Sequence, residues 1–173
     1  MAATHYFVDE SKAGSYLLVA VEVPSDVQPA IRKELRSLVL PGQRRLHMTK
    51  ERDSRRRAII AAIQAAGVKA VVYDAGRSLR DLAARAVCLA ALVADVAESG
   101  GRIVLERDES LGTWDDQRLI EITRNLEAGL VRYEHRSPTE ELLLGLPDAI
   151  AWCWAKGGDW RRQVAPFTVT CAV

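Results

Sequence analysis

The chain has 173 residues, of which 49% are hydrophobic and 27% are charged, and its formal net charge is +1. This size and composition fit one folded domain, predicted here over residues 1–173, that buries a core without covalent or metal cross-links. The near-zero net charge excludes a global electrostatic attraction to nucleic acid or to anionic membranes, so any attraction to phosphate has to be local.

The cysteines and the apolar segments bear on the compartment of the protein. Cys88, Cys153 and Cys171 lie far apart, and their odd number and spacing argue against a disulfide framework or a metal site. The N-terminus lacks the basic and then apolar pattern of a signal peptide. The longest apolar stretch, residues 86–97, contains Asp95 and is too short to cross a bilayer. We therefore expect a cytoplasmic protein without a membrane partner.

The first part of the chain predicts a β-hairpin followed by a helix. Residues 5–8 and 16–23 are rich in β-branched and aromatic side chains, and the turn-forming stretch "DESKAGS" separates them. Pro24 ends the second strand, and apolar residues at a helical period then predict a helix over residues 27–38.

The rest of the chain predicts helices and strands in alternation. The stretch "RRLHMT", residues 44–49, is predicted as a short strand, and Thr49 as the N-cap of a helix over about residues 50–66 that Gly67 ends. The later predicted elements are a strand over 68–75, a helix over 79–98 capped by Ser78, a strand over 102–106, a helix over 114–128, a strand over 130–135, a helix over 147–155 and a strand over 167–173.

This order of elements predicts an α/β fold. The sheet is expected to be mixed, with an antiparallel hairpin at its start and parallel βα units after it, and helices are expected to flank it. The unbroken apolar runs "KAVVY" and "RIVL" favour central parallel strands covered on both faces.

Acidic residues stand where predicted strands and a helix begin or end. Asp9 closes the first strand and Glu106 closes "RIVLE"; the tripeptide "DES" occurs at both places. Ligands of open α/β sheets gather beyond the ends of central strands, so two parallel neighbours would bring both carboxylates to one edge. Asp148, at the start of a very apolar helix, adds a third acid. Carboxylate oxygens suit Mg²⁺, and two such ions about 4 Å apart hold the attacking water and the leaving oxygen in phosphodiester hydrolysis.

The ordered set of "YFVDES", a short "LH" segment, a late strand ending in an acid, and "LGLPDAIAWCWA" resembles the ribonuclease H-like superfamily. Within it, the resemblance is to the family catalogued as domain of unknown function 3800, and it spans nearly the whole chain. It implies a ribonuclease H-like fold and a nuclease that uses Mg²⁺ or Mn²⁺ to cleave RNA or DNA, leaving 3′-hydroxyl and 5′-phosphate ends.

The resemblance also implies the site residues. Asp9 matches the acid of the first strand and Asp148 the acid of the last helix. The acid of the late strand is Glu106 if the apolar runs are aligned and Asp108 if the repeated "DES" is aligned, and the strand period favours Glu106. The chain departs from the family pattern at Arg45, two residues before the histidine of "LH", where the family usually carries Glu.

These considerations predict a set of site residues. The expected catalytic residues are Asp9, Glu106, Asp148 and His47, and the expected ligands of Mg²⁺ or Mn²⁺ are Asp9, Glu106 and Asp148, with Glu51 or Asp108 as a fourth. His47 is included because imidazole titrates near neutrality and can move a proton or meet a phosphate. The residues expected to bind nucleic acid are Lys50, Arg52, Arg55 and Arg56, in the basic run "KERDSRRR".

Structural explanations and other functions compete with this interpretation. Asp9 can be the polar end of a strand, and Asp148 a favourable helix start after Pro147. The basic run can be a solvated helix face. Arg45 and the near-neutral net charge favour a catalytically weak or inactive module that keeps the fold for binding nucleic acid or protein. A third hypothesis is a component of a mobile-element or phage-defence system that acts with a protein partner.

Overall fold

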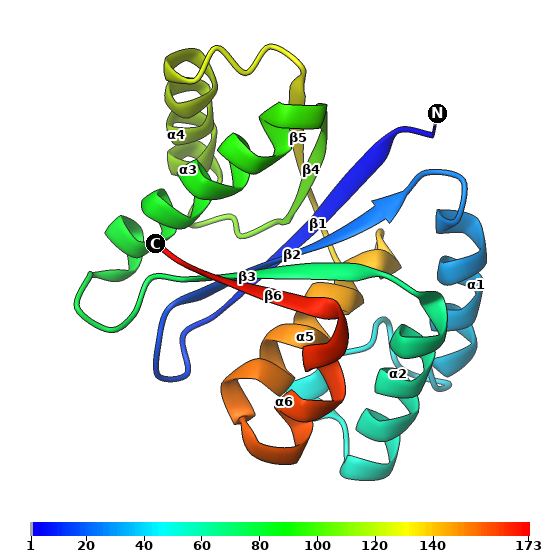
Figure 1. Ribbon diagram of the computed structural model, residues 1–173. Coiled ribbons are helices and arrows are strands. Elements are labelled where there is room, and N and C mark those ends of the chain that lie inside the picture. The colour runs from blue at the N-terminus through cyan, green and yellow to red at the C-terminus, as the bar shows by residue number, and fades with distance from the viewer. Residues whose placement is uncertain (1) are drawn as a thin grey trace.

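Six strands form one mixed sheet, and helices cover both of its faces in the computed structural model, which describes residues 2–173 (Figure 1). The strands are β1 (Thr4–Ser11), β2 (Leu17–Pro24), β3 (Lys69–Asp74), β4 (Gly101–Glu106), β5 (Val131–Arg136) and β6 (Thr168–Ala172). The α-helices are α1 (Gln28–Leu38), α2 (Asp53–Ala66), α3 (Asp81–Ser99), α4 (Gly112–Asn125), α5 (Gly145–Lys156) and α6 (Gly158–Val164). Short 3₁₀ helices are η1 (Met48–Lys50), η2 (Leu142–Leu144) and η3 (Ala165–Phe167).

The strand order is β5-β4-β1-β2-β3-β6. β2 is antiparallel to both β1 and β3, whereas β4 is parallel to β1 and β5, and β6 is parallel to β3. The predicted α/β class, the initial hairpin and the mixed sheet are therefore confirmed. The central placement of "KAVVY" and "RIVL" was wrong, because the β1–β2 hairpin occupies the middle of the sheet and β3 and β4 flank it. β3 is second from one edge, and its only parallel neighbour is β6.

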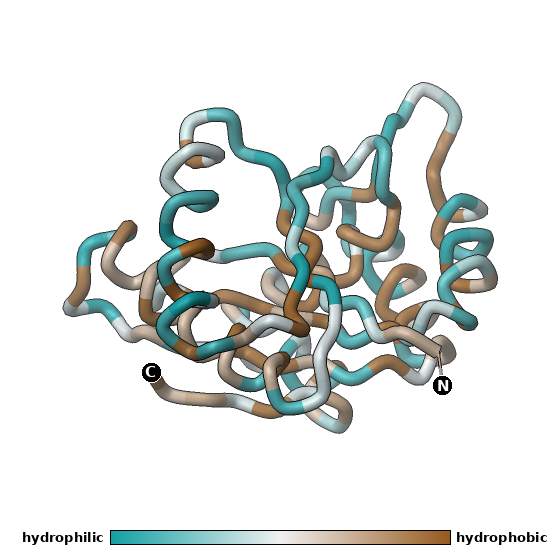
Figure 2. The backbone as a smooth tube through the Cα atoms, turned by 90° about the horizontal axis from the view of Figure 1, so that it is seen from above, coloured by the Kyte–Doolittle hydropathy of each residue, from teal (hydrophilic) through white to brown (hydrophobic). Residues whose placement is uncertain are grey.

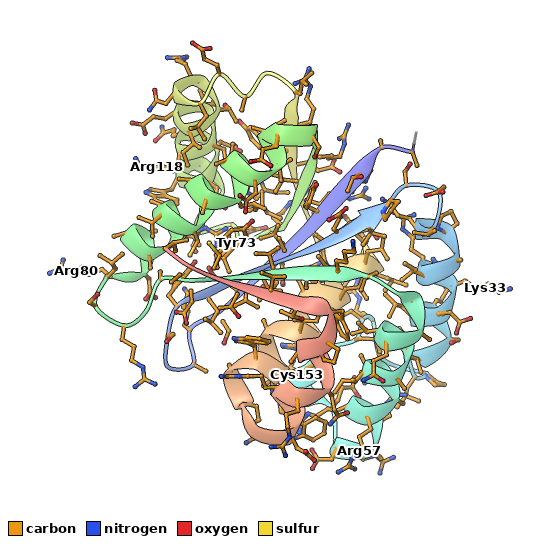
Figure 3. The ribbon with its side chains drawn as sticks, viewed as in Figure 1. Lys33, Arg57, Tyr73, Arg80, Arg118 and Cys153 are labelled. Atoms are coloured by element: carbon orange, nitrogen blue, oxygen red, sulfur yellow. The ribbon has the colours of Figure 1, made fainter. Side chains whose placement is uncertain are left out.

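The side chains of each strand alternate between two apolar cores, one on each face of the sheet. Phe7 of β1 and Val104 of β4 belong to the core beneath α1, α2 and α5, while Val8 and Leu105 belong to the core beneath α3 and α4. Figure 2 shows the hydrophobic residues concentrated along the central strands and the inner sides of the helices. In Figure 3, Tyr73 and Cys153 lie inside, whereas Lys33, Arg57, Arg80 and Arg118 project from the rim.

Most helix positions agree with the apolar period, but several boundaries differ. Gly67 ends α2 in the left-handed conformation at φ 68°, as predicted. α2 begins at Asp53 rather than near residue 50, and α3 begins at Asp81 after Arg80, without a cap from Ser78. α4 ends at Asn125, three residues before the predicted end, and the seven-residue α6 was not predicted.

The segment predicted as a strand over residues 44–49 is not a strand. Both edges of β1 are already paired, with β2 and β4, so this segment cannot pair with β1. Its backbone is held by side chains instead: the Met48 N–H donates to Asp148 at 2.9 Å, and Arg56 donates to the Met48 carbonyl at 2.9 Å. The result is a loop that ends in η1 and packs against the start of α5.

Candidate active site

Four of the predicted acids, Asp9, Glu106, Asp148 and Asp108, line one cleft of about 480 Å³ at the carboxyl ends of β1 and β4, which we call the acidic cleft. Val8 pairs with Leu105 in the parallel β1–β4 register, so Asp9 and Glu106 are the next residues on neighbouring strands. Alternation sends both of them to the face that carries Phe7, which is the face covered by α5. Asp148, in the first turn of α5, completes the group.

Glu10, the other carboxylate of "VDES", turns to the opposite face of the sheet. It accepts a hydrogen bond from Arg85 at 2.6 Å, is paired with Lys12 at 3.3 Å, and contacts the Tyr16 hydroxyl. Glu10 and Arg85 also line the acidic cleft, but these partners engage the Glu10 carboxylate, so Asp9 is the residue of this dipeptide on the same face as Glu106.

Asp148 is held in place by the loop that precedes η1. One of its oxygens accepts the Met48 N–H at 2.9 Å, and the other lies 3.9 Å from Nε2 of His47. The aspartate follows Pro147 in the first turn of the helix, where the helix dipole favours a negative charge. Asp148 can therefore stabilise the start of α5 and line the acidic cleft at the same time.

The acids perturb one another because they are close and poorly solvated. Burial raises the pKa of Asp9 well above its usual value, and the neighbouring Glu106 and Asp148 raise it further, against one backbone hydrogen bond from Glu10. Burial likewise raises the pKa of Asp148, although the Met48 N–H, His47 and Arg45 oppose that rise. The cleft therefore holds more negative charge than the surrounding groups compensate, and a cation placed there would relieve it.

Arg45 supplies part of the compensating charge. Its guanidinium lies 3.5 Å from a Glu106 oxygen and 3.5 Å from Nδ1 of His47. The side chains of Arg45 and Glu106 are both about one quarter exposed. This pair places a cation in the cleft at the position where the resemblance leads one to expect a carboxylate.

The donor set suits Mg²⁺ or Mn²⁺, since carboxylate oxygens are the ligands these ions prefer. Within residues 2–173, however, no three or more His, Cys, Asp or Glu side chains have the arrangement of a metal site as they stand. Two of the acids are engaged elsewhere, Glu106 by Arg45 and Asp148 by the Met48 N–H.

The two residues predicted as a fourth ligand have other surroundings. Glu51 is 6% exposed and does not line the acidic cleft; its oxygens accept from Gln43 at 3.0 Å and from Arg55 at 3.2 Å. Asp108 does line the cleft, but it is exposed and closes its own turn by accepting from Ser110. The structure therefore brings Asp108, and not Glu51, to the rim of the acidic cleft.

The basic run predicted to bind nucleic acid is divided between structural and exposed side chains. Arg55 holds Glu51 and the Leu38 carbonyl, and Arg56 stacks over Trp152 at 4.3 Å from the ring centre. Lys50 and Arg52 are exposed. Of the four residues predicted to bind nucleic acid, Lys50 and Arg52 are therefore the ones whose side chains are exposed to solvent.

An ionic network beside the acidic cleft was not predicted. Arg85 of α3, with 6% of its side chain exposed, donates two hydrogen bonds of 2.7 Å to Asp115 of α4. Asp115 also lies 3.0 Å from Nε2 of His135 on β5. Burial alone would raise the pKa of Asp115, but the hydrogen bonds with Arg85 and His135 outweigh it and hold this pKa below its usual value. An arginine within the apolar helix "LAARAVCLAAL" was the available signal.

Comparisons with known proteins add no assignment to this geometry. No family model matches the chain, and no curated protein matches its sequence. Among residues 2–173, no helix has both the length and the hydropathy that crossing a bilayer requires.

Proposed function

We propose that the protein is a metal-dependent nuclease with a ribonuclease H-like fold. The observation that carries the proposal is the meeting of Asp9, Glu106 and Asp148, from three distant segments, in one cleft where burial and mutual repulsion raise the pKa of Asp9. The hairpin start and the later parallel strands β4 and β5 support the fold assignment.

Each side chain has a definite role in this proposal. Asp9, Glu106 and Asp148 would hold Mg²⁺ or Mn²⁺, which when bound activates the attacking water and stabilises the leaving oxygen. His47, on the cleft wall with 28% of its side chain exposed, would accept or donate a proton at the substrate phosphate through Nε2. The substrate class is a phosphodiester strand of RNA or DNA.

Cleavage assays with matched variants test this proposal. Labelled RNA and DNA strands are incubated with Mg²⁺ or Mn²⁺ and with the parent, Asp9→Asn or Asp148→Asn. Loss of a group that only supports a ligand lowers activity about 10–100-fold, so loss of a ligand should lower it at least about 100-fold. Glu34→Gln, on the exposed side of α1, should keep full activity. Equal cleavage by the parent and both aspartate variants would exclude the acidic cleft as the active site.

The ion pair between Arg45 and Glu106 favours a second candidate, a nucleic-acid-binding module without turnover. In that case the guanidinium would stay paired with Glu106, and no divalent ion would enter. Mn²⁺ would then leave the melting temperature of the parent and of Asp9→Asn unchanged, whereas a nuclease should be stabilised by Mn²⁺ only in the parent. Salt-sensitive retention of nucleic acid without cleavage would support the module.

A further inference from the structure

A second cleft, of about 360 Å³, adjoins the acidic cleft and shares Arg45 and His47 with it. We call it the basic cleft. Its lining comes from residues 42–51, the loop that leads into η1, and from Thr139 after β5. Arg45 and His47 therefore form a common wall, with Asp9, Glu106 and Asp148 on one side and the cations Arg44 and Lys50 on the other.

The charge of the basic cleft is positive and available to a ligand. Arg44 and Lys50 are exposed in its lining, and Arg45 is about one quarter exposed. Glu51 is the only acid among the lining residues, and it is 6% exposed. Because both Glu51 oxygens already accept hydrogen bonds from neighbouring side chains, this carboxylate does not cancel the cations that face solvent.

The chemistry of the lining suits a phosphate group. An arginine offers a planar fork of N–H donors and a lysine a compact charge, and both are common phosphate-binding groups in proteins. The Thr139 hydroxyl lies 2.8 Å from the Ser137 hydroxyl, which orients it at the rim as a neutral hydrogen-bonding group. Arg55 and Arg56 of the neighbouring helix are engaged in contacts within the protein, whereas Arg44 and Lys50 in the basic cleft, and Arg52 outside it, are exposed.

We infer that the basic cleft binds a phosphate of a nucleic-acid strand adjacent to the phosphate that enters the acidic cleft. This inference rests on the proposed function and specifies how the strand lies. The strand passes over the shared wall, with Arg44 and Lys50 holding one phosphate and the acids facing the scissile one. Cations beside a carboxylate site also offset the repulsion that the acids exert on a polyanion.

Charge reversal in the basic cleft, compared with charge reversal elsewhere, tests this inference. Binding of a short fluorescein-labelled single strand is measured by fluorescence anisotropy in EDTA, where no metal-dependent cleavage occurs, over a series of salt concentrations. The test variant is Arg44→Glu/Lys50→Glu. The control is Lys33→Glu/Arg36→Glu, which makes the same change in net charge on the exposed side of α1 (Figure 3).

The expected result is a loss of affinity of at least about tenfold in the test variant and of less than about twofold in the control. Each phosphate contact to a single strand contributes about 0.7 to the slope of log affinity against log salt, so losing the one contact held by Arg44 and Lys50 should reduce the slope by about 0.7. Equal losses in both variants, or no loss in either, would overturn the inference.

The outcome is separable from that of the nuclease proposal. If no ion supports cleavage but only the Arg44/Lys50 variant loses binding in EDTA, the basic cleft stands and the nuclease fails. If the parent cleaves and the Arg44/Lys50 variant cleaves with unchanged KM and unchanged affinity, the nuclease stands and the basic cleft fails.

Discussion

Replacement of Arg85 by Met tests whether the network beside the acidic cleft stabilises the fold. The substitution keeps much of the apolar volume but removes the guanidinium that joins β1, α3 and α4 through Glu10 and Asp115. Asp115, with 2% of its side chain exposed, then keeps only its contact with His135 at 3.0 Å.

The expected loss follows from that burial. Removing one partner of a buried ion pair typically lowers the free energy of unfolding by about 3–5 kcal/mol, since a buried charge is left unpaired. His135 still partners Asp115, so we expect the lower end, about 3 kcal/mol. In a protein of this size each kcal/mol lowers the melting temperature by about 2–4 °C, which gives a fall of about 6–12 °C.

The loss should also depend on pH. The pKa of Asp115 is lowered in the folded protein, so its stabilising contribution is present above the unfolded pKa and is lost as pH falls through the folded pKa. In Arg85→Met burial would raise this pKa, so as pH falls the carboxyl is protonated first in the variant, and in the parent only when pH falls through its lowered pKa. The difference between parent and variant should therefore shrink in acid.

Urea unfolding followed by circular dichroism at neutral and acidic pH measures both effects. The control is Arg162→Met, whose pair with Asp159 is about three quarters exposed and should contribute less than about 1 kcal/mol. A loss below about 1 kcal/mol for Arg85→Met, equal at both pH values, would refute the reasoning.

Three further predictions concern the acidic cleft. Because the pKa of Asp9 is raised, the metal-free protein loses stability as pH rises through that pKa. Asp9→Asn should therefore raise the free energy of unfolding at neutral pH by about 1 kcal/mol in urea, whereas the control Glu34→Gln should leave it unchanged. A destabilised Asp9→Asn variant would argue against mutual repulsion among the carboxylates. Arg45→Ala frees Glu106 and should tighten Mn²⁺ binding severalfold in calorimetric titration, whereas weaker binding would mean that the guanidinium supports the metal site. Glu51→Gln should lower the melting temperature but leave Mn²⁺ affinity unchanged, and a loss of that affinity would restore Glu51 as a ligand.

The three acids could be identified from sequence because local patterns mark each of them, whereas their meeting also requires the parallel pairing of β1 with β4. Strand alternation separates Asp9 from Glu10, the end of an apolar run selects Glu106 over Asp108, and Pro147 marks the helix start before Asp148. None of these patterns requires knowledge of distant packing.

The features that escaped prediction depend on long-range contacts. The loop before η1 reads locally as a strand, but its backbone is held by the Met48 N–H, which donates to the distant Asp148, and by Arg56 of α2, which donates to the Met48 carbonyl. The partners of Glu51 likewise depend on how that loop folds back on α2. Arg85 and Asp115 are 30 residues apart on different helices, and no local period indicates that they meet.

The most direct test of the central claim is a crystal structure of the protein soaked in Mn²⁺, with the ion located by its anomalous scattering. The nuclease proposal predicts manganese in the acidic cleft, bound to an Asp9 oxygen and to oxygens of Glu106 and Asp148, with Glu106 turned away from Arg45. An acidic cleft without manganese at millimolar concentration, with the Arg45–Glu106 pair unchanged, would contradict it.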